Sequence, residues 1–208
     1  MKRSALLPLL LCALLTVGCV RSLHPIYTEK TLTYDPAFLG AWVADDEDGT
    51  RLEIAASSGN EQPDAIKSYR VVHTDKDKKS TTLLGHLARV GDMLVADLTI
   101  GDETGLPDSD FYKAHLFPLH TFWIVRCDAQ RLTHRSLDHD WMKKFIDENP
   151  GAIAHYKSND DVILTAPPEA LQKFLLAHAR DPEMLTGESV FRRGKPAATA
   201  PTTAPASP

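Results

Sequence analysis

Three residues near the middle of the chain carry side chains that could hold a ligand. His86 and Asp97 belong to the stretch TTLLGHLARVGDMLVADLTI, residues 81–100, which contains a two-residue Gly-Asp hairpin connection. This turn would place His86 opposite Asp97, and a carboxylate beside an imidazole can orient a base or bind a polar group. The alternative is a solvated cross-strand pair without a function. Together with Trp123 on a later strand, these two residues form a ligand-binding hypothesis.

A second group of candidates lies in the run THRSLDHDW, residues 133–141. It contains metal-ligating side chain types, but the spacing of His134 and His139 matches no standard zinc motif. A junction between a strand and a helix, with Asp138 or Asp140 as the N-cap, explains the acidic residues without a metal. We therefore predict neither a metal ion nor a cofactor.

The motifs of the common catalytic sites are missing from the sequence. There is no glycine-rich phosphate loop, no Gly-x-Ser-x-Gly and no His-Glu-x-x-His. No side chain can be given a catalytic role on these grounds. We predict no catalytic residue, and we do not expect an enzyme.

The N-terminus has the features of an export signal. Lys2 and Arg3 precede an apolar run from Ala5 to Val17, which only Pro8 and Thr16 interrupt. This run is shorter than the roughly 20 apolar residues that span a bilayer. Its length and its basic start are typical of a secretory signal peptide, which is removed from the mature protein.

The residues that follow the apolar run add a second signal. Thr16, Val17 and Gly18 stand directly before Cys19, and this order resembles the lipobox of bacterial lipoproteins that signal peptidase II processes. The resemblance implies that the Cys19 thiol receives a diacylglyceryl group, that cleavage occurs before Cys19, and that its new amine is acylated. Thr16 stands where leucine is commonest in the family. The alternative is an ordinary signal peptide with an incidental cysteine.

The lipobox implies a location and a first partner. A protein with several acyl chains at Cys19 would be anchored stably to a membrane of the cell envelope without spanning it. Val20 follows the cysteine, in place of the aspartate that marks inner-membrane retention in enteric bacteria. We therefore expect an outer-membrane lipoprotein and leave open which face of that membrane it occupies.

Charge and cysteine content limit the other partners. The chain has 23 basic and 28 acidic residues, and removal of Lys2 and Arg3 with the signal changes its formal charge from −5 to −7. An acidic body argues against binding to nucleic acid, which basic surfaces usually recognise. Cys127 would be the one cysteine besides Cys19 in the mature chain, so no intramolecular disulfide is expected and Cys127 is best explained as a small buried side chain.

Composition divides the chain into four segments. After the signal peptide, residues 1–18, a segment of residues 19–36 with two prolines is predicted to be a lipidated tether that could extend about 55–60 Å. A β-rich globular domain is predicted over residues 37–193. Residues 194–208 are built mainly from Ala, Pro, Thr and Ser and cannot bury a core, so we expect them to be disordered.

Periodicity within the domain predicts mainly strands followed by two helices. The hairpin of residues 81–100 and a second hairpin across residues 128–130 are the clearest strand signals. Near the C-terminus, DHDWMKKFIDEN and PPEALQKFLLAHARD have helical spacing. We predict a mainly β fold, either an antiparallel β-barrel or a sandwich, with two helices near the C-terminal end.

A family resemblance favours the barrel. The sequence Gly40-Ala41-Trp42 near the start of the first strand of the domain resembles the Gly-x-Trp signature of lipocalins and related calycin barrels. The resemblance implies an eight-stranded barrel whose closed end is sealed by Trp42. It also implies that a C-terminal arginine, here Arg192 or Arg193, packs across that ring, an arrangement stabilised by cation–π attraction.

Two classes of function remain open at the level of sequence. The chain is predicted to be a membrane-anchored envelope lipoprotein of unknown specific activity, acting as an interaction or structural module whose partner is an envelope protein. The alternative is a lipocalin-like carrier of a small apolar ligand. A carrier requires a cavity in the barrel, whereas an interaction module requires a filled barrel and an exposed apolar patch.

Overall fold

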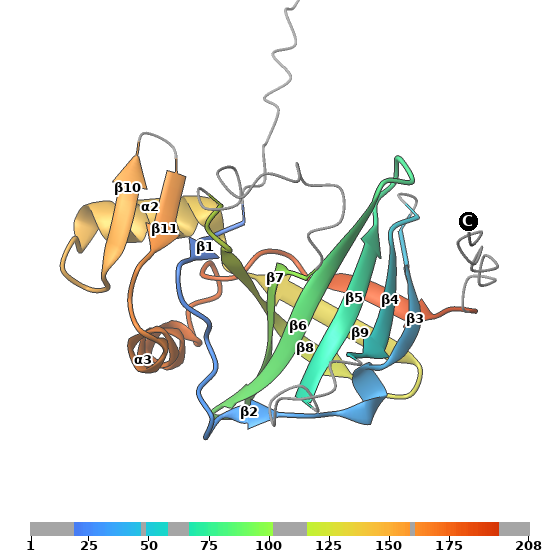
Figure 1. The fold of residues 1–208 in the computed structure, drawn as a ribbon. Helices are drawn as coiled ribbons and strands as arrows, with labels where there is room; N and C mark the ends of the chain where they lie inside the picture. The colour runs from blue at the N-terminus through green and yellow to red at the C-terminus, as the bar shows by residue number, and fades with distance from the viewer. Residues whose placement is uncertain (1–18, 47–48, 58–66, 102–115, 159–160, 196–208) are drawn as a thin grey trace, which may run out of the picture.

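The fold is mainly β, as predicted, and its centre is a closed antiparallel barrel accompanied by two helices (Figure 1). The computed structural model describes residues 19–46, 49–57, 67–101, 116–158 and 161–195. The predicted signal peptide and most of the predicted disordered tail lie outside these residues.

Eight strands form the barrel, and each is antiparallel to both of its neighbours. The chain runs up and down through seven of them, and the last strand pairs with both the seventh and the first, which closes the barrel. In order around the barrel they are β3 (Gly40–Ala44), β4 (Arg51–Ala56), β5 (Ser68–Thr74), β6 (Ser80–Val90), β7 (Met93–Ile100), β8 (His120–Cys127), β9 (Arg131–Ser136) and β12 (Ser189–Arg193).

The β6–β7 hairpin has the predicted register. Val90 pairs with Met93, and the ladder continues through His86 with Asp97 to Leu83 with Ile100. Gly91 adopts φ +58° at the turn, a left-handed conformation that glycine takes without steric cost. The local pattern of the sequence was therefore sufficient to set this pairing.

The burial of the hairpin differs from the prediction on one face. Leu87, Ala96 and Leu98, on the more apolar face, point into the barrel. On the opposite face, a solvated His86–Asp97 pair was the alternative to a functional one, but Ala88 and Val95 on that face are fully buried in a second apolar cluster. The pair is not solvated because other segments of the chain cover the outside of β6, β7 and β8.

Much of that cover is a layer on one side of the barrel (Figure 1). It contains α2 (His139–Glu148), β10 (His155–Ser158), β11 (Asp161–Leu164) and α3 (Pro168–His178). Of the two N-cap candidates, Asp138 caps α2 by accepting a hydrogen bond from the Trp141 N–H at 2.9 Å, and Pro168 opens α3. The apolar faces of both helices contribute to the second cluster, with Met142, Ile146, Leu171 and Leu175 buried.

Residues 19–36 form part of the fold and do not make the predicted extended tether. β1 (Arg21–Ser22) pairs with β8 and with β11, and β2 (Leu32–Thr33) pairs with β6. Ile26 is buried between the barrel wall and the helical layer. The two prolines suggested an extended chain, but the apolar side chains between them find a surface to cover, which extends the folded body to the N-terminal side of residue 37.

Candidate ligand-binding site

One end of the barrel is sealed by side chains, and we call it the closed end. The Trp42 side chain is fully buried there, and its Nε1–H donates to the carbonyl of Phe38 at 3.1 Å. Phe38 belongs to a 3-10 turn, η1 (Pro36–Phe38), that crosses this end, and its ring meets the edge of Tyr69. The barrel interior next to Trp42 is filled by apolar side chains such as Leu52 and Leu132.

Arg193 completes the closed end. Its guanidinium carbon lies 3.7 Å from the centroid of the Trp42 ring, and its nitrogens donate to the carbonyls of Ala37, Leu39 and Ala129. Gly40 has φ +123°, and a Cβ at this position would collide with the Arg193 side chain. The glycine, the tryptophan and this arginine are thus one packing unit.

The second arginine considered at sequence level lies elsewhere. Arg192 points out of the barrel and donates to the Asp45 carboxylate at 2.6 Å. The guanidinium hydrogen bond lowers the pKa of Asp45, although this surface pair contributes little to stability because both groups are hydrated. Arg192 therefore takes no part in sealing the closed end.

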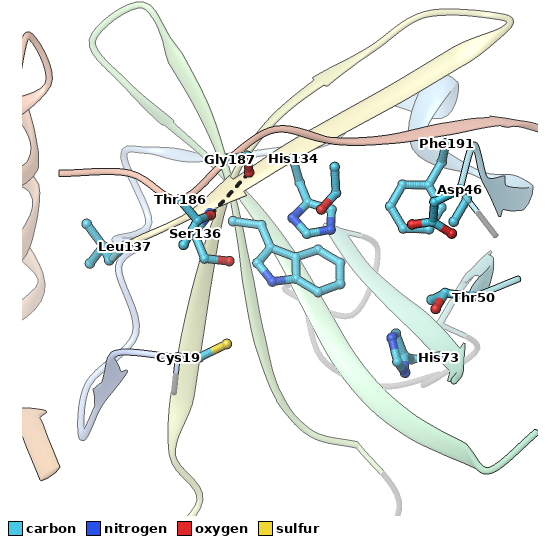
Figure 2. A pocket seen from close by; sticks show the side chains of 13 residues that line it. Cys19, Asp46, Thr50, His73, His134, Ser136, Leu137, Thr186, Gly187 and Phe191 are labelled. Atoms are coloured by element: carbon cyan, nitrogen blue, oxygen red, sulfur yellow. Dashed lines mark hydrogen bonds between the residues drawn. The ribbon is translucent and has the colours of Figure 1, made fainter. Parts of the chain in front are cut away.

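A pocket of about 390 Å³ lies at the opposite end, which we call the open end (Figure 2). Its walls come from the ends of β3, β5 and β9 and the beginning of β12. The lining residues are Cys19, Ala44, Asp46, Thr50, His73, Trp123, His134, Ser136, Leu137, Thr186, Gly187, Ser189 and Phe191. The volume is within the range of small-molecule sites, and the lining combines aromatic and hydroxyl groups.

Three stacked rings form the floor of the pocket. The His134 ring lies parallel to Trp123, with centroids 4.2 Å apart and an interplanar angle of 10°, and its centroid lies 5.6 Å from that of Phe191. The three residues come from β8, β9 and β12, which are adjacent strands. Such a stack offers flat apolar surface to a ligand, with polar atoms at its margins.

Burial keeps the His134 imidazole neutral. It lowers the pKa of His134 to about 4, and the nearby His73 adds a smaller effect in the same direction. Among the described residues, the Nδ1 atom of His134 is one of two buried side-chain polar atoms without a hydrogen-bond partner. Unpartnered buried nitrogens are uncommon in folded proteins, which makes this ring a candidate for a functional role.

Cys19 lines the same pocket. Its side chain is directed into the pocket from the side opposite His73 (Figure 2). Cys19 is solvent-exposed, but the surrounding protein raises the pKa of its thiol through desolvation. Cys19, for which the sequence predicts lipidation, therefore borders the mouth of the barrel.

His86 and Asp97 do not line the pocket, although their predicted cross-strand pairing is present. Asp97 is fully buried on the outer face of the barrel wall, where its carboxylate accepts hydrogen bonds from the Ile26 N–H at 2.7 Å and from Nδ1 of His120 at 2.6 Å. His86 lies beside it against the Tyr27 ring. Both residues therefore hold the N-terminal segment, and of the three ligand-binding candidates Trp123 alone faces the pocket.

The candidate metal residues are dispersed. His134 faces the barrel interior, Asp138 caps α2, and His139 lies 3.6 Å from Asp140 at the start of that helix. Within the described ranges, no group of three or more His, Cys, Asp or Glu side chains is arranged to bind a metal ion.

The helices of these ranges are too short or too polar to cross a membrane.

Cys127 is an unreactive thiol at the closed end. Its Sγ–H donates to the carbonyl of Ala37 at 3.1 Å, and desolvation raises its pKa to about 11. A thiol with such a pKa is almost entirely protonated at neutral pH and is a poor nucleophile.

Several pocket residues were not singled out from the sequence. His73, Ser136 and Phe191 occur on strands that are far apart in the chain, and no spacing rule connects them. His134 was considered only as a metal ligand. The one available signal was the alternation along β9, which places His134 on the same face as the buried Leu132.

Comparisons with protein-family models, with curated proteins and with solved structures found no match to this chain.

Proposed function

We propose that the mature chain is a lipid-anchored protein of the bacterial cell envelope, in the outer membrane, that binds a small amphipathic ligand at the open end of its barrel. The observation that supports this best is the pocket with its floor of Trp123, His134 and Phe191. The stacked rings would receive a flat or apolar part of the ligand. The hydroxyl groups of Ser136 and Thr186 at the margin would contact a polar part.

The likeness to lipocalins belongs to this proposal. It is supported by the up-and-down order of the strands and by the unit of Gly40, Trp42 and Arg193 at the closed end. A carrier with this architecture would be sealed at one end and would exchange its ligand at the other. The two helices and two short strands inserted between β9 and β12 would be an addition to the simple barrel.

An interaction module is the second candidate. Much of the barrel interior below the pocket is filled by its own side chains, including Leu52, Tyr69 and Leu98. In addition, Tyr156 on β10 and Leu176 on α3 are exposed apolar side chains on the outer layer. A protein partner in the envelope would use this layer and would not need the pocket.

Ligand binding is tested with the full lipidated chain, purified from bacterial membranes in detergent. We expect native mass spectrometry to show an added mass that organic extraction removes. Titration with fatty acids and lysophospholipids should give saturable binding that Trp123→Ala weakens about 5- to 30-fold, because the loss of one ring contact is worth roughly 1–2 kcal/mol. Tyr156→Ala, an exposed aromatic outside the pocket, is the matched control. An unliganded mass together with no saturable binding would rule out the carrier and favour the interaction module.

Lipid attachment is tested separately by growth with radiolabelled palmitate. The label should appear in the wild-type chain and in Cys127→Ala, and it should be absent from Cys19→Ala. Incorporation that survives the loss of Cys19 would contradict the anchor.

A further inference from the structure

We propose that the open end of the barrel rests on the anchoring membrane, so that the pocket faces the lipid headgroups and takes up its amphipathic ligand from that bilayer. This inference rests on the proposed function, because it requires a lipid on Cys19. It adds an orientation and a source of ligand, neither of which follows from the presence of an anchor alone.

The first argument is that no flexible linker separates Cys19 from the folded body. Val20, the next residue, is only 3% exposed. Arg21 and Ser22 form β1, which is paired on both sides, with β8 and with β11. The Leu23 N–H then donates to the Leu164 carbonyl at 2.8 Å. An anchor on Cys19 therefore connects directly to a rigid sheet, without a flexible linker that would let the barrel turn away from the membrane.

A second clamp fixes the segment a few residues further on. The Ile26 N–H donates to the buried Asp97 carboxylate at 2.7 Å, and the Ile26 carbonyl accepts from Nε2 of Gln172 at 2.7 Å. These partners belong to the barrel wall and to α3. The backbone of one residue, Ile26, is thus held from two sides through its N–H and its carbonyl, which keeps residues 20–26 on the folded body and prevents them from acting as a linker.

The third argument is the position of Cys19 relative to the pocket. Its side chain lines the pocket, so a glyceryl group attached to Sγ would begin at the pocket wall (Figure 2). The lipid chains must leave through the open end to reach a bilayer, because the other end is sealed by Trp42 and Arg193. This path brings the mouth of the pocket to the membrane surface.

The rim of the open end is suited to that surface. Ile100 at the end of β7 and Phe117 just before β8 are 47% and 61% exposed, and the pairing of Leu98 with Thr121 places both at the open end. Apolar and aromatic side chains in such positions can enter the interfacial region of a bilayer. By contrast, the β8–β9 turn at the closed end exposes Asp128 and Gln130.

The rim of the open end carries both positive and negative side chains. Charge therefore does not set the orientation of the barrel on the membrane, and the covalent anchor does. The exposed β5–β6 turn, residues 75–79, carries Lys76, Lys78 and Lys79, which suit lipid phosphates. It also carries Asp77, and Asp45 and Asp46 follow β3 at the same end. These opposite charges allow close approach to headgroups without a strong electrostatic preference.

The test uses the full lipidated chain with Cys127→Ala, reconstituted in vesicles of phosphatidylethanolamine and phosphatidylglycerol. Each variant carries a nitroxide on one introduced cysteine. Phe117→Cys and Ser80→Cys place the label at the open end, and Ala129→Cys places it at the closed end. Collision rates with oxygen, which concentrates in lipid, and with a water-soluble nickel complex are then measured. Ser80, the first residue of β6 directly after the β5–β6 turn, and Ala129, in the β8–β9 turn, are both exposed, which makes them a matched pair.

We expect labels at positions 117 and 80 to be severalfold less accessible to nickel than the label at 129, and the label at 117 to be the most accessible to oxygen. Equal nickel accessibility at the two ends would overturn the orientation. Palmitate labelling of the same preparations distinguishes a failure of the proposed anchor from a failure of the proposed orientation. A preparation without palmitate contradicts the anchor itself, whereas palmitate with equal accessibility contradicts only the proposed orientation.

Discussion

At the scale of single residues, His134 links the chemistry of the pocket to the stability of the barrel. Its ring is stacked between Trp123 and Phe191, and burial makes the charged form unfavourable. In the unfolded chain the same imidazole has its ordinary affinity for a proton, with a pKa near 6.5. Protonation of His134 must therefore favour unfolding.

The first prediction concerns the pH dependence that follows from this burial. Because the pKa of His134 falls from about 6.5 in the unfolded chain to about 4 in the folded one, the unfolded state binds more protons between these values. The contribution of the neutral ring to the free energy of unfolding is complete above pH 6.5. It is lost as the pH falls toward 4, a change of about 3 kcal/mol.

Urea unfolding of the wild type and of His134→Phe at intervals from pH 7 to pH 4 measures this effect. The variant keeps a stacked ring without a titrating group, so its free energy of unfolding should decline less steeply. Parallel curves for the two proteins would contradict the assignment.

At the scale of elements, the N-terminal segment depends on contacts to two distant parts of the chain. Asp97 on β7 accepts the Ile26 N–H, and Gln172 on α3 donates to the Ile26 carbonyl and to Oγ1 of Thr31. Asp97 also pairs with His120. A fully buried carboxylate with two such partners is costly to disturb, because removing it leaves an N–H group and an imidazole without an acceptor.

The second prediction is that Asp97→Ala releases this segment. We expect a loss of about 3 kcal/mol in the free energy of unfolding, in line with unsatisfied buried donors, and about 1 kcal/mol for Gln172→Ala. Hydrogen exchange at the Ile26 amide should accelerate in Asp97→Ala more than the global destabilisation requires. Exchange at Val95, within the β7 ladder, is the internal control. Unchanged protection of Ile26 relative to Val95 would show that the segment is held by other contacts.

At the scale of the whole molecule, two apolar clusters share one wall. The barrel interior and the layer with α2 and α3 lie on opposite faces of β6, β7 and β8. Leu87 and Ala88, which are adjacent in sequence, belong to different clusters. Loss of either cluster exposes one face of the same strands, so the two should unfold together.

The third prediction is therefore a single cooperative transition. Leu132→Ala in the barrel and Met142→Ala in α2 remove fully buried side chains, and each should lower the free energy of unfolding by about 2–5 kcal/mol. In both variants the transitions followed by tryptophan fluorescence and by far-UV circular dichroism should coincide. Separate midpoints for the two probes in Met142→Ala would indicate that the helical layer unfolds on its own.

The sequence by itself determined the features that depend on short-range physics. The β6–β7 register followed from one turn and the alternation of side chains, and the start of α2 was narrowed to two capping candidates, Asp138 and Asp140, of which Asp138 is the cap. The position of Gly40 and Trp42 near the start of a strand was also readable. In each case the residues that decide the structure are within a few positions of one another.

Only the tertiary structure decided what covers the outside of the barrel and which residues meet in the pocket. Alternation shows that the two faces of a strand differ, but it does not show whether a distant segment will bury the less apolar face. Asp97 meets Ile26 across 71 positions, and Gln172 meets it across 146. Such contacts arise because closure of the barrel and packing of the helices bring together surfaces that no local pattern relates. As a result, the N-terminal segment, which the sequence predicts to be a tether, is fixed to the barrel and begins at the pocket.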